Sequence, residues 1–214
     1  MEAYSSIRAA IDFTMPRNRN VIQLTSSMAG EGKSTTAVIL AELFASLGRK
    51  TLLVDADLRR PSVAALLDIE RPKVGIVEVL LGHVALDAAV VKGVHENLEI
   101  LPVGEIPRNP TEILASREMR EFIEKVRNEY SLVIFDSCPV MGLADAPTLA
   151  HLVDGTVFVL EANRLPFGQV RSAVRRLTVA GGNVIGVVLT KYRALQAGQS
   201  YNYQYGYYEY GRDK

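Results

Sequence analysis

The chain has 214 residues, of which 48% are hydrophobic and 22% are charged, enough to build one globular domain with a sizeable core. Its 24 basic and 24 acidic residues give a formal net charge of zero, so no overall field favours nucleic acid or an anionic membrane. The single cysteine, Cys138, excludes an intramolecular disulfide, and no apolar run is long enough to predict a membrane span or an export signal. We therefore expect a cytoplasmic chain.

Short apolar segments alternate with helical segments along the chain. In order, they are a helix over 2–13, a strand over 21–25, a helix over 34–47, a strand over 51–55, short helices near 75–81 and 86–91, a strand over 98–102, a helix from Asn109, strands over 132–136 and 155–160, a helix over 169–180 and a strand over 184–190. The strands are rich in Val, Ile and Leu without alternating polar residues, which is typical of a parallel sheet buried on both faces. The alternation predicts a doubly wound α/β fold with a mostly parallel sheet.

The helix that begins at Asn109 has the clearest start signal. Asn109 is expected as the N-cap, Pro110 occupies the first helical position, and Glu112 stands at the third. Apolar residues then recur at helical spacing as one stripe: Ile113, Met119, Phe122, Ile123 and Val126. The pattern predicts one helix that carries the whole stripe.

A phosphate-binding loop follows the first predicted strand. Residues 26–35 read Ser-Ser-Met-Ala-Gly-Glu-Gly-Lys-Ser-Thr, in which Gly-Lys-Ser opens a helix. Backbone N–H groups of such a loop bind phosphate, and its glycines let the backbone approach closely. Lys33 is expected to meet the terminal phosphates and the Ser34 hydroxyl to bind Mg²⁺. The predicted nucleotide-binding residues are Gly30, Glu31, Gly32, Lys33, Ser34 and Thr35.

Carboxylates stand at the ends of two further strands. Asp55 ends the second strand and Asp57 follows it, while Asp136 ends the fourth strand after four apolar residues. Ligands bind at the carboxyl ends of strands in open α/β sheets, so these carboxylates should lie near the phosphate loop. There they can hold Mg²⁺, directly or through water, or accept a hydroxyl proton. Asp136 is expected to complete the metal site, and a solvated turn with a helix cap is the alternative for the other two.

Three motifs together resemble the bacterial tyrosine kinases (BY-kinases) of capsule and exopolysaccharide assembly: the phosphate loop, Asp55-Ala56-Asp57-Leu58-Arg59 and Phe135-Asp136-Ser137-Cys138-Pro139. The resemblance covers nearly the whole chain and implies a P-loop NTPase fold, with ATP and Mg²⁺ as cofactors. It implies that Asp57 activates the tyrosine hydroxyl. The implied catalytic residues are Lys33, Asp57 and Asp55, and the implied metal site is Ser34, Asp55 and Asp136.

The resemblance also implies partners. These kinases form rings and phosphorylate one another's tyrosine-rich tails, and a membrane-spanning activator, fused or separate, switches them on. We therefore expect a polysaccharide co-polymerase as activator, a protein-tyrosine phosphatase, a homo-oligomer and a place at the inner face of the plasma membrane, with no nucleic acid. The chain departs from the family at Ser5, where the ring-interface motif has an arginine, and at Thr190, where an asparagine contacts adenine.

The last segment differs from the rest of the chain. Residues 196–214 are polar and rich in Gly and Tyr, and we expect a flexible tail after a kinase domain over 1–195, with an interface helix over 1–15. Six of the nine tyrosines lie here, as expected phosphate acceptors: Tyr201, Tyr203, Tyr205, Tyr207, Tyr208 and Tyr210. A stacking surface for single-stranded nucleic acid and an adhesive, unphosphorylated tail are the alternatives.

Other functions can use the same phosphate loop. An ATPase switch of the partition or septum-placing type shares the fold, but it carries a second lysine five residues before Lys33, where this chain has Met28. A nucleotide-binding scaffold without catalysis would not need the intact Lys33, Ser34, Asp57 and Asp136 set. A loop that binds only a structural anion is a further alternative, because Ser27 replaces the first glycine of the usual pattern.

Overall fold

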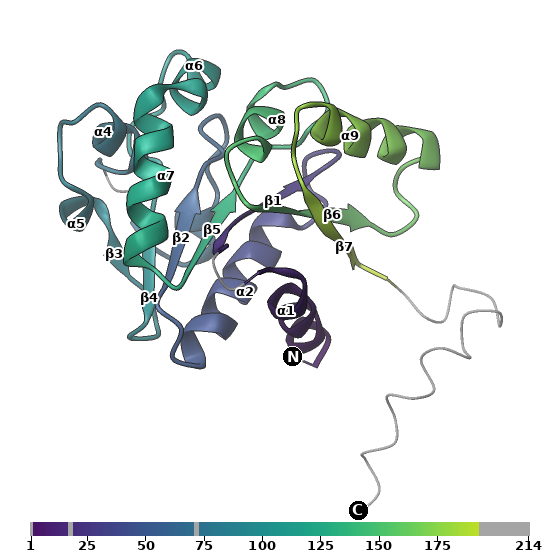
Figure 1. Ribbon diagram of the computed structural model, residues 1–214, viewed down its shortest axis with the longest axis horizontal. Helices are drawn as coiled ribbons and strands as arrows, with labels where there is room; N and C mark the ends of the chain where they lie inside the picture. Colours follow the sequence, from purple (N-terminus) through teal and green to yellow (C-terminus); the bar gives the residue numbers. More distant parts are fainter. Residues whose placement is uncertain (1, 17–18, 71–72, 193–214) are drawn as a thin grey trace, which may run out of the picture.

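The computed structural model describes residues 2–16, 19–70 and 73–192 (Figure 1). Within these residues the chain forms a seven-stranded sheet of order β3-β4-β2-β5-β1-β6-β7. The strands are β1 (Val21–Ser26), β2 (Thr51–Asp55), β3 (Val91–Lys92), β4 (Leu98–Leu101), β5 (Leu132–Asp136), β6 (Gly155–Glu161) and β7 (Val184–Thr190). β3 runs antiparallel to β4, and the other neighbours are parallel. The prediction of a doubly wound, mostly parallel sheet is confirmed.

Helices cover both faces of this sheet (Figure 1). They are α1 (Glu2–Thr14), α2 (Lys33–Ser46), α3 (Val63–Leu66), α4 (Ile76–Leu80), α5 (Leu86–Ala89), α6 (Pro110–Ala115), α7 (Arg117–Glu129), α8 (Asp145–Ala150) and α9 (Phe167–Val179). α1 and α2 share one hydrophobic core with the sheet, α4 to α7 share a second, and α8 and α9 pack with β6 in a third. In the described part of the chain, no helix is long and apolar enough to span a membrane.

The central strands are rich in consecutive apolar residues because both of their faces are buried. Leu53 of β2 and Ile134 of β5 pack in the core that contains α2, whereas Val54 and Phe135 beside them pack in the core that contains α7. Phe135 meets Phe122 of α7 edge to face, with 6.4 Å between ring centroids. Successive residues of a strand point to opposite faces, so burial on both sides favours apolar residues at consecutive positions.

The apolar stripe predicted as one helix from Asn109 is divided between α6 and α7, so that prediction was wrong. The break is at Ser116, whose backbone is extended (φ −67°, ψ 164°) and whose hydroxyl accepts a hydrogen bond from the Met119 backbone N–H at 3.1 Å. Asn109 makes no side-chain capping bond, and its amide donates to Glu112 instead. Serine is a favourable N-cap residue, so Ser116 starts a second helix, α7, which carries the rest of the apolar stripe.

Three short elements were absent from the sequence prediction: α3, α8 and β3. Each has six residues or fewer, too few to display a helical or strand period. α3 and α8 nonetheless matter for function, because they stand at the same edge of the sheet as the phosphate loop. α3 follows Asp55 by way of Ser62, and α8 begins at Asp145 beside Arg59.

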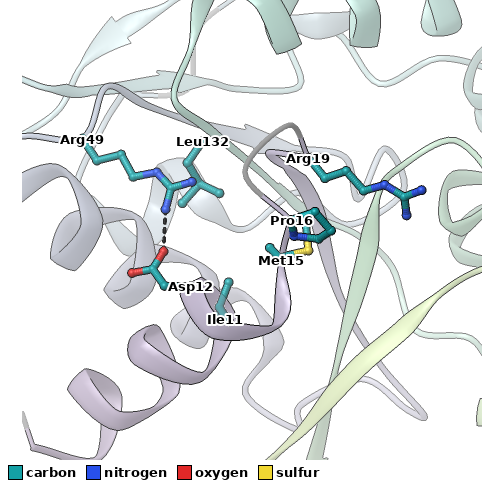
Figure 2. Close-up of a pocket in the computed structure, with 7 residues that line it drawn as sticks. All are labelled: Ile11, Asp12, Met15, Pro16, Arg19, Arg49 and Leu132. Carbon is teal, nitrogen blue, oxygen red and sulfur yellow. Dashed lines mark hydrogen bonds and ion pairs between the residues drawn. The ribbon is translucent and has the colours of Figure 1, made fainter.

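A cavity of about 210 Å³ lies at the amino ends of the strands, opposite the phosphate loop. Figure 2 shows Arg49 reaching toward Asp12 of α1, with 2.6 Å between Nη1 and Oδ1. Arg49 also donates two hydrogen bonds to the Ser131 carbonyl and stacks on Phe44, 5.1 Å from the ring centroid. This one side chain therefore connects α1 to the end of α2 and the start of β5.

Candidate active site

The phosphate loop connects β1 to α2 at the carboxyl edge of the sheet. α2 begins at Lys33, and Gly32 before it has φ 91°, while Gly30 has φ 85°. Both values lie in the left-handed region, which glycine adopts without steric cost. Ser34 and the exposed Thr35 follow in the first turn of α2. The strand, loop and helix expected around the Gly-Lys-Ser sequence are all present.

The buried Glu31 side chain stabilises the conformation of the phosphate loop from inside the protein. Its Oε2 accepts the Met28 backbone N–H at 2.7 Å, and its Oε1 accepts the Glu161 backbone N–H at 3.3 Å. The Glu31 carbonyl accepts the hydroxyl of Thr190 at 2.7 Å. The carboxylate thus shapes the loop, and any contact of Glu31 with phosphate would come from its backbone N–H.

Lys33 is the centre of the site. The residue is only 7% exposed, and its ammonium lies 3.2 Å from Asp57 Oδ2, 3.4 Å from Asp136 Oδ1 and 3.0 Å from the Ser34 hydroxyl. Burial opposes the charge, but Asp136 and Asp57 outweigh it and raise the pKa of Lys33. The cation predicted to meet the terminal phosphates is therefore held charged between two carboxylates.

Asp55 is buried beside Asp136, which it faces across the β2–β5 pairing. Burial raises the pKa of Asp55 from 3.8 to about 7, and the charge of Asp136 adds to the increase. Its carboxylate accepts the backbone N–H groups of Ser62 and Val63, both at 3.0 Å, and of Asp57 at 3.2 Å. Asp55 thereby orders the turn that carries Asp57. Burial likewise raises the pKa of Asp136, although Lys33 and Ser34 counteract it.

The donor atoms gathered here fit Mg²⁺. They are a hydroxyl oxygen from Ser34 and carboxylate oxygens from Asp55 and Asp136, and Mg²⁺ prefers oxygen ligands with several waters or phosphate oxygens. The Lys33 ammonium contacts two of these groups, the Ser34 hydroxyl and the Asp136 carboxylate. No group of three or more His, Cys, Asp or Glu in the described residues has metal-binding geometry, so the chain offers no all-protein metal cage there. A nucleotide-dependent magnesium site agrees with this donor set.

Two contacts of the site were not foreseen from the sequence. The Ser62 hydroxyl donates to the Ser34 hydroxyl at 2.9 Å, which connects the α3 turn to α2. Arg59 is paired with Asp145, 2.7 Å from Nε to Oδ2, and donates to the Thr111 hydroxyl at 3.0 Å. Arg59 thereby joins the Asp57 turn to α6 and α8. These contacts join residues that are 28 to 86 positions apart in the sequence, so no local motif predicts them.

The single cysteine of the chain lies in an environment that limits its reactivity. Cys138 is buried in the core beneath α8 and α9. Burial raises the pKa of its thiol to about 12, which disfavours a nucleophilic thiolate. The six tail tyrosines lie outside the described residues, as does the boundary drawn at residue 196.

Comparison with known sequences finds the AAA domain family over residues 19–163. The tyrosine-protein kinase YwqD of Bacillus subtilis (strain 168) is 36% identical over 208 residues, which cover 97% of this chain and 85% of that protein. The succinoglycan biosynthesis transport protein ExoP of Rhizobium meliloti (strain 1021) is 32% identical. That match covers 97% of this chain but 28% of ExoP, which is a much longer protein.

Solved kinase domains have the same fold. The VpsO kinase domain is 32% identical with a TM-score of 0.82, over 89% of this chain and 94% of that one. The kinase domain of the Escherichia coli tyrosine kinase ETK is 27% identical with a TM-score of 0.83, over 90% and 77%. The septum site-determining protein MinD of Pyrococcus horikoshii is 24% identical (TM-score 0.68, 80% and 70% covered), a likeness in fold alone. The chain therefore belongs to the bacterial tyrosine kinase family.

Proposed function

We propose that this chain is an ATP-dependent protein-tyrosine autokinase that regulates the synthesis and export of a capsular or extracellular polysaccharide. The observation that carries the proposal is the buried Lys33 ammonium between Asp57 and Asp136, beside a phosphate loop. A cation among carboxylates at a phosphate site suits phosphoryl transfer, in which positioning and charge stabilisation supply most of the catalysis. The relatives YwqD, a tyrosine-protein kinase, and ExoP, a succinoglycan biosynthesis transport protein, support the kinase activity and the polysaccharide context.

In the chemical step, Lys33 and the phosphate loop hold ATP and Asp57 accepts the proton of the tyrosine hydroxyl. Lys33 and the loop N–H groups hold the β- and γ-phosphates of ATP. Asp57, which is only 4% exposed and held by the Arg60 backbone N–H at 3.1 Å, takes the proton from a tyrosine hydroxyl. The phenolic oxygen bonds to the γ-phosphorus as the bond to the bridging oxygen breaks, and ADP leaves.

Ser34, Asp55 and Asp136 would hold Mg²⁺, which neutralises charge on the bridging and terminal phosphates when bound. Asp55 would also have a structural role, since its carboxylate accepts hydrogen bonds from the backbone N–H groups of the turn that carries Asp57. The proton acceptor and the metal site are thus built on one loop. A change in either is expected to affect the other.

The phosphate acceptors in this proposal are the tail tyrosines of a neighbouring subunit: Tyr201, Tyr203, Tyr205, Tyr207, Tyr208 and Tyr210. Thr190 ends β7 at the same edge as the phosphate loop, and its hydroxyl contacts Glu31 there. The segment between Thr190 and Tyr201 reaches about 33 Å when extended, at about 3.3 Å per residue. That reach includes the site of the same subunit and that of a neighbour.

The expected partners follow from the family. They are a membrane-spanning polysaccharide co-polymerase as activator, a protein-tyrosine phosphatase and further copies of this chain in a ring. The family has the activator as a separate chain or fused to the kinase, and ExoP, which is more than three times as long as its matched part, suggests the fused arrangement. Through that partner the kinase would act at the cytoplasmic face of the plasma membrane.

The test is incubation of the purified chain with ATP and Mg²⁺, followed by intact and peptide mass spectrometry. Phosphate is expected on tyrosines between 201 and 210 in the parent chain and in Asp87→Asn, an exposed carboxylate control. Asp57→Asn should show none. ATP consumed without any mass gain would replace the proposal with an ATPase switch. Neither consumption nor mass gain, even with the activator's cytosolic segment added, would indicate a scaffold.

A further inference from the structure

Three consecutive carbonyls of the phosphate loop are bound from outside by side chains near the ends of β6 and β7. Arg164 donates to the Ala29 carbonyl at 2.8 Å, Lys191 to the Gly30 carbonyl at 2.9 Å, and Thr190 to the Glu31 carbonyl at 2.7 Å. The two cations share one counter-ion, Glu161, whose Oε2 lies 2.8 Å from Arg164 Nη1 and 2.9 Å from Lys191 Nζ.

We propose that Glu161, Arg164 and Lys191 are positioning residues that hold the phosphate loop in its anion-binding conformation. We call these three side chains the outer bracket. The proposal deepens the nucleotide-binding part of the proposed function and rests on it. No motif contains the bracket residues, which stand more than 100 residues from the loop in the sequence.

The geometry of the peptide unit connects these outward contacts to the direction of the loop N–H groups. In a trans peptide the carbonyl of one residue and the N–H of the next point in opposite directions, and the described residues contain no cis peptide. Drawing the carbonyls of Ala29, Gly30 and Glu31 outward therefore turns the N–H groups of Gly30, Glu31 and Gly32 the other way. Those are the N–H groups that a phosphate loop offers to its ligand. The bracket fixes the direction of the Gly30 and Glu31 N–H groups before any ligand arrives, and Thr190 does the same for the Gly32 N–H.

The backbone of the bracket is shaped for this contact. Asn163 (φ 58°) and Lys191 (φ 52°) are both in the left-handed region, which residues other than glycine seldom adopt. The Ala162 N–H donates to the Thr190 carbonyl at 3.0 Å, so the two segments are joined. The fit is also close, since a Cβ on Gly30 would lie 3.1 Å from Arg164 Nη1. The same two cations lower the pKa of Glu161, which keeps the counter-ion charged.

Binding of a fluorescent ADP analogue with Mg²⁺ tests the bracket, and Glu161→Ala is the decisive variant. Charge alone predicts tighter binding, because the change removes an anion near the phosphates. The bracket predicts weaker binding, by about 5-fold or more, the factor that one net hydrogen bond contributes. Unchanged or tighter binding by a folded Glu161→Ala would overturn the proposal.

Further variants separate positioning from a general effect on folding. Arg164→Ala and Lys191→Ala should each weaken binding, whereas the exposed controls Arg171→Ala and Lys73→Ala should not. Arg164→Lys should recover part of the affinity, and Arg164→Ala should matter less when Glu161 is already absent. The melting temperature without nucleotide should change little, because the bracket side chains are partly exposed. A loss of affinity in the controls as large as that in the bracket variants would contradict a positioning role. Bracket variants that lose thermal stability but keep the parent affinity would contradict it as well.

Failure of the bracket and failure of the proposed function give different results. If the parent chain binds the ADP analogue and the bracket variants bind it equally well, the phosphate loop binds nucleotide without the bracket, and the bracket inference is wrong. If the parent chain itself does not bind the analogue, the nucleotide site is wrong, and the proposed function falls with it.

Discussion

Lys33 combines burial with charge, an arrangement that is costly unless it serves a ligand or a network. Its ammonium is enclosed by Asp57, Asp136 and the Ser34 hydroxyl. Methionine has a similar length and no charge, so Lys33→Met should preserve the packing of α2. We expect tyrosine phosphorylation to fall by at least about 10²-fold, the usual loss for one preorganised stabilising group. Phosphotyrosine mass spectrometry, beside a circular dichroism spectrum, measures both effects.

The matched control is Lys125→Met, which removes an exposed lysine from α7. That variant should phosphorylate at the parent rate. Full activity in a folded Lys33→Met chain would remove the phosphate loop from the mechanism.

The same substitution has a pH signature in the apoprotein. Burial raises the pKa of Asp55 and of Asp136, and the Lys33 cation opposes that increase. With the cation present, the pKa of Asp55 is raised to about 7. A carboxyl with a raised pKa favours the fold while protonated, and that stability is lost as the pH rises from about 4 through its folded pKa. Without the cation both pKa values rise further, so ionisation opposes folding more strongly.

We therefore expect the stability deficit of Lys33→Met to widen between pH 5 and pH 8. Urea unfolding at the two pH values measures the free energy of unfolding of both chains. For Lys125→Met the difference from the parent should be the same at both values. A deficit for Lys33→Met that is constant or shrinks with pH would show that the lysine does not counter the buried carboxylates.

At the scale of elements, the junction of α6 and α7 depends on one hydroxyl. The Ser116 side chain accepts the Met119 N–H at 3.1 Å, while Asn109 makes no such bond at the start of α6. Ser116→Ala should therefore cost about 1 kcal/mol, the usual value of an N-cap. Asn109→Ala should cost clearly less. Chemical denaturation of the two variants compares them directly, and an equal cost would mean that Ser116 does not act as the cap.

The strands and their carboxyl edge could be predicted because one physical rule governs them. Burial on both faces requires the apolar runs of β1, β2 and β5, and parallel strands bring their polar ends to one edge. Lys33, Asp55, Asp57 and Asp136 therefore meet as the sequence predicted. The apolar stripe gave no sign of the break at Ser116, because its residues keep helical spacing across both helices.

The contacts around the loop could not be predicted, because they join residues that no local pattern relates. Glu161, Arg164 and Lys191 look like ordinary surface charges in the sequence, and they meet the loop only because β6 and β7 lie beyond β1 in the sheet (Figure 1). Arg59 and Asp145 are 86 positions apart and meet through the turn after β2. The order of the strands, rather than any motif, brings these groups together.

At the scale of the whole molecule, charge is balanced: 24 basic residues against 24 acidic ones. The six tail tyrosines would change that balance, since each phosphate adds a charge of about −1.5 to −2. Fully phosphorylated copies would repel one another through their tails, whereas unmodified copies carry no net charge to oppose assembly. We expect phosphorylation to weaken self-association.

Light scattering after size exclusion compares the mass of the two forms. The phosphorylated form should have the lower mass, and the difference should shrink as salt is raised, because the screening length falls from about 10 Å at 0.1 M to about 3 Å at 1 M. A chain with the six tyrosines changed to phenylalanine is the control, and ATP should leave its mass unchanged. Equal masses at low salt would exclude charge repulsion between tails as the means by which autophosphorylation controls assembly.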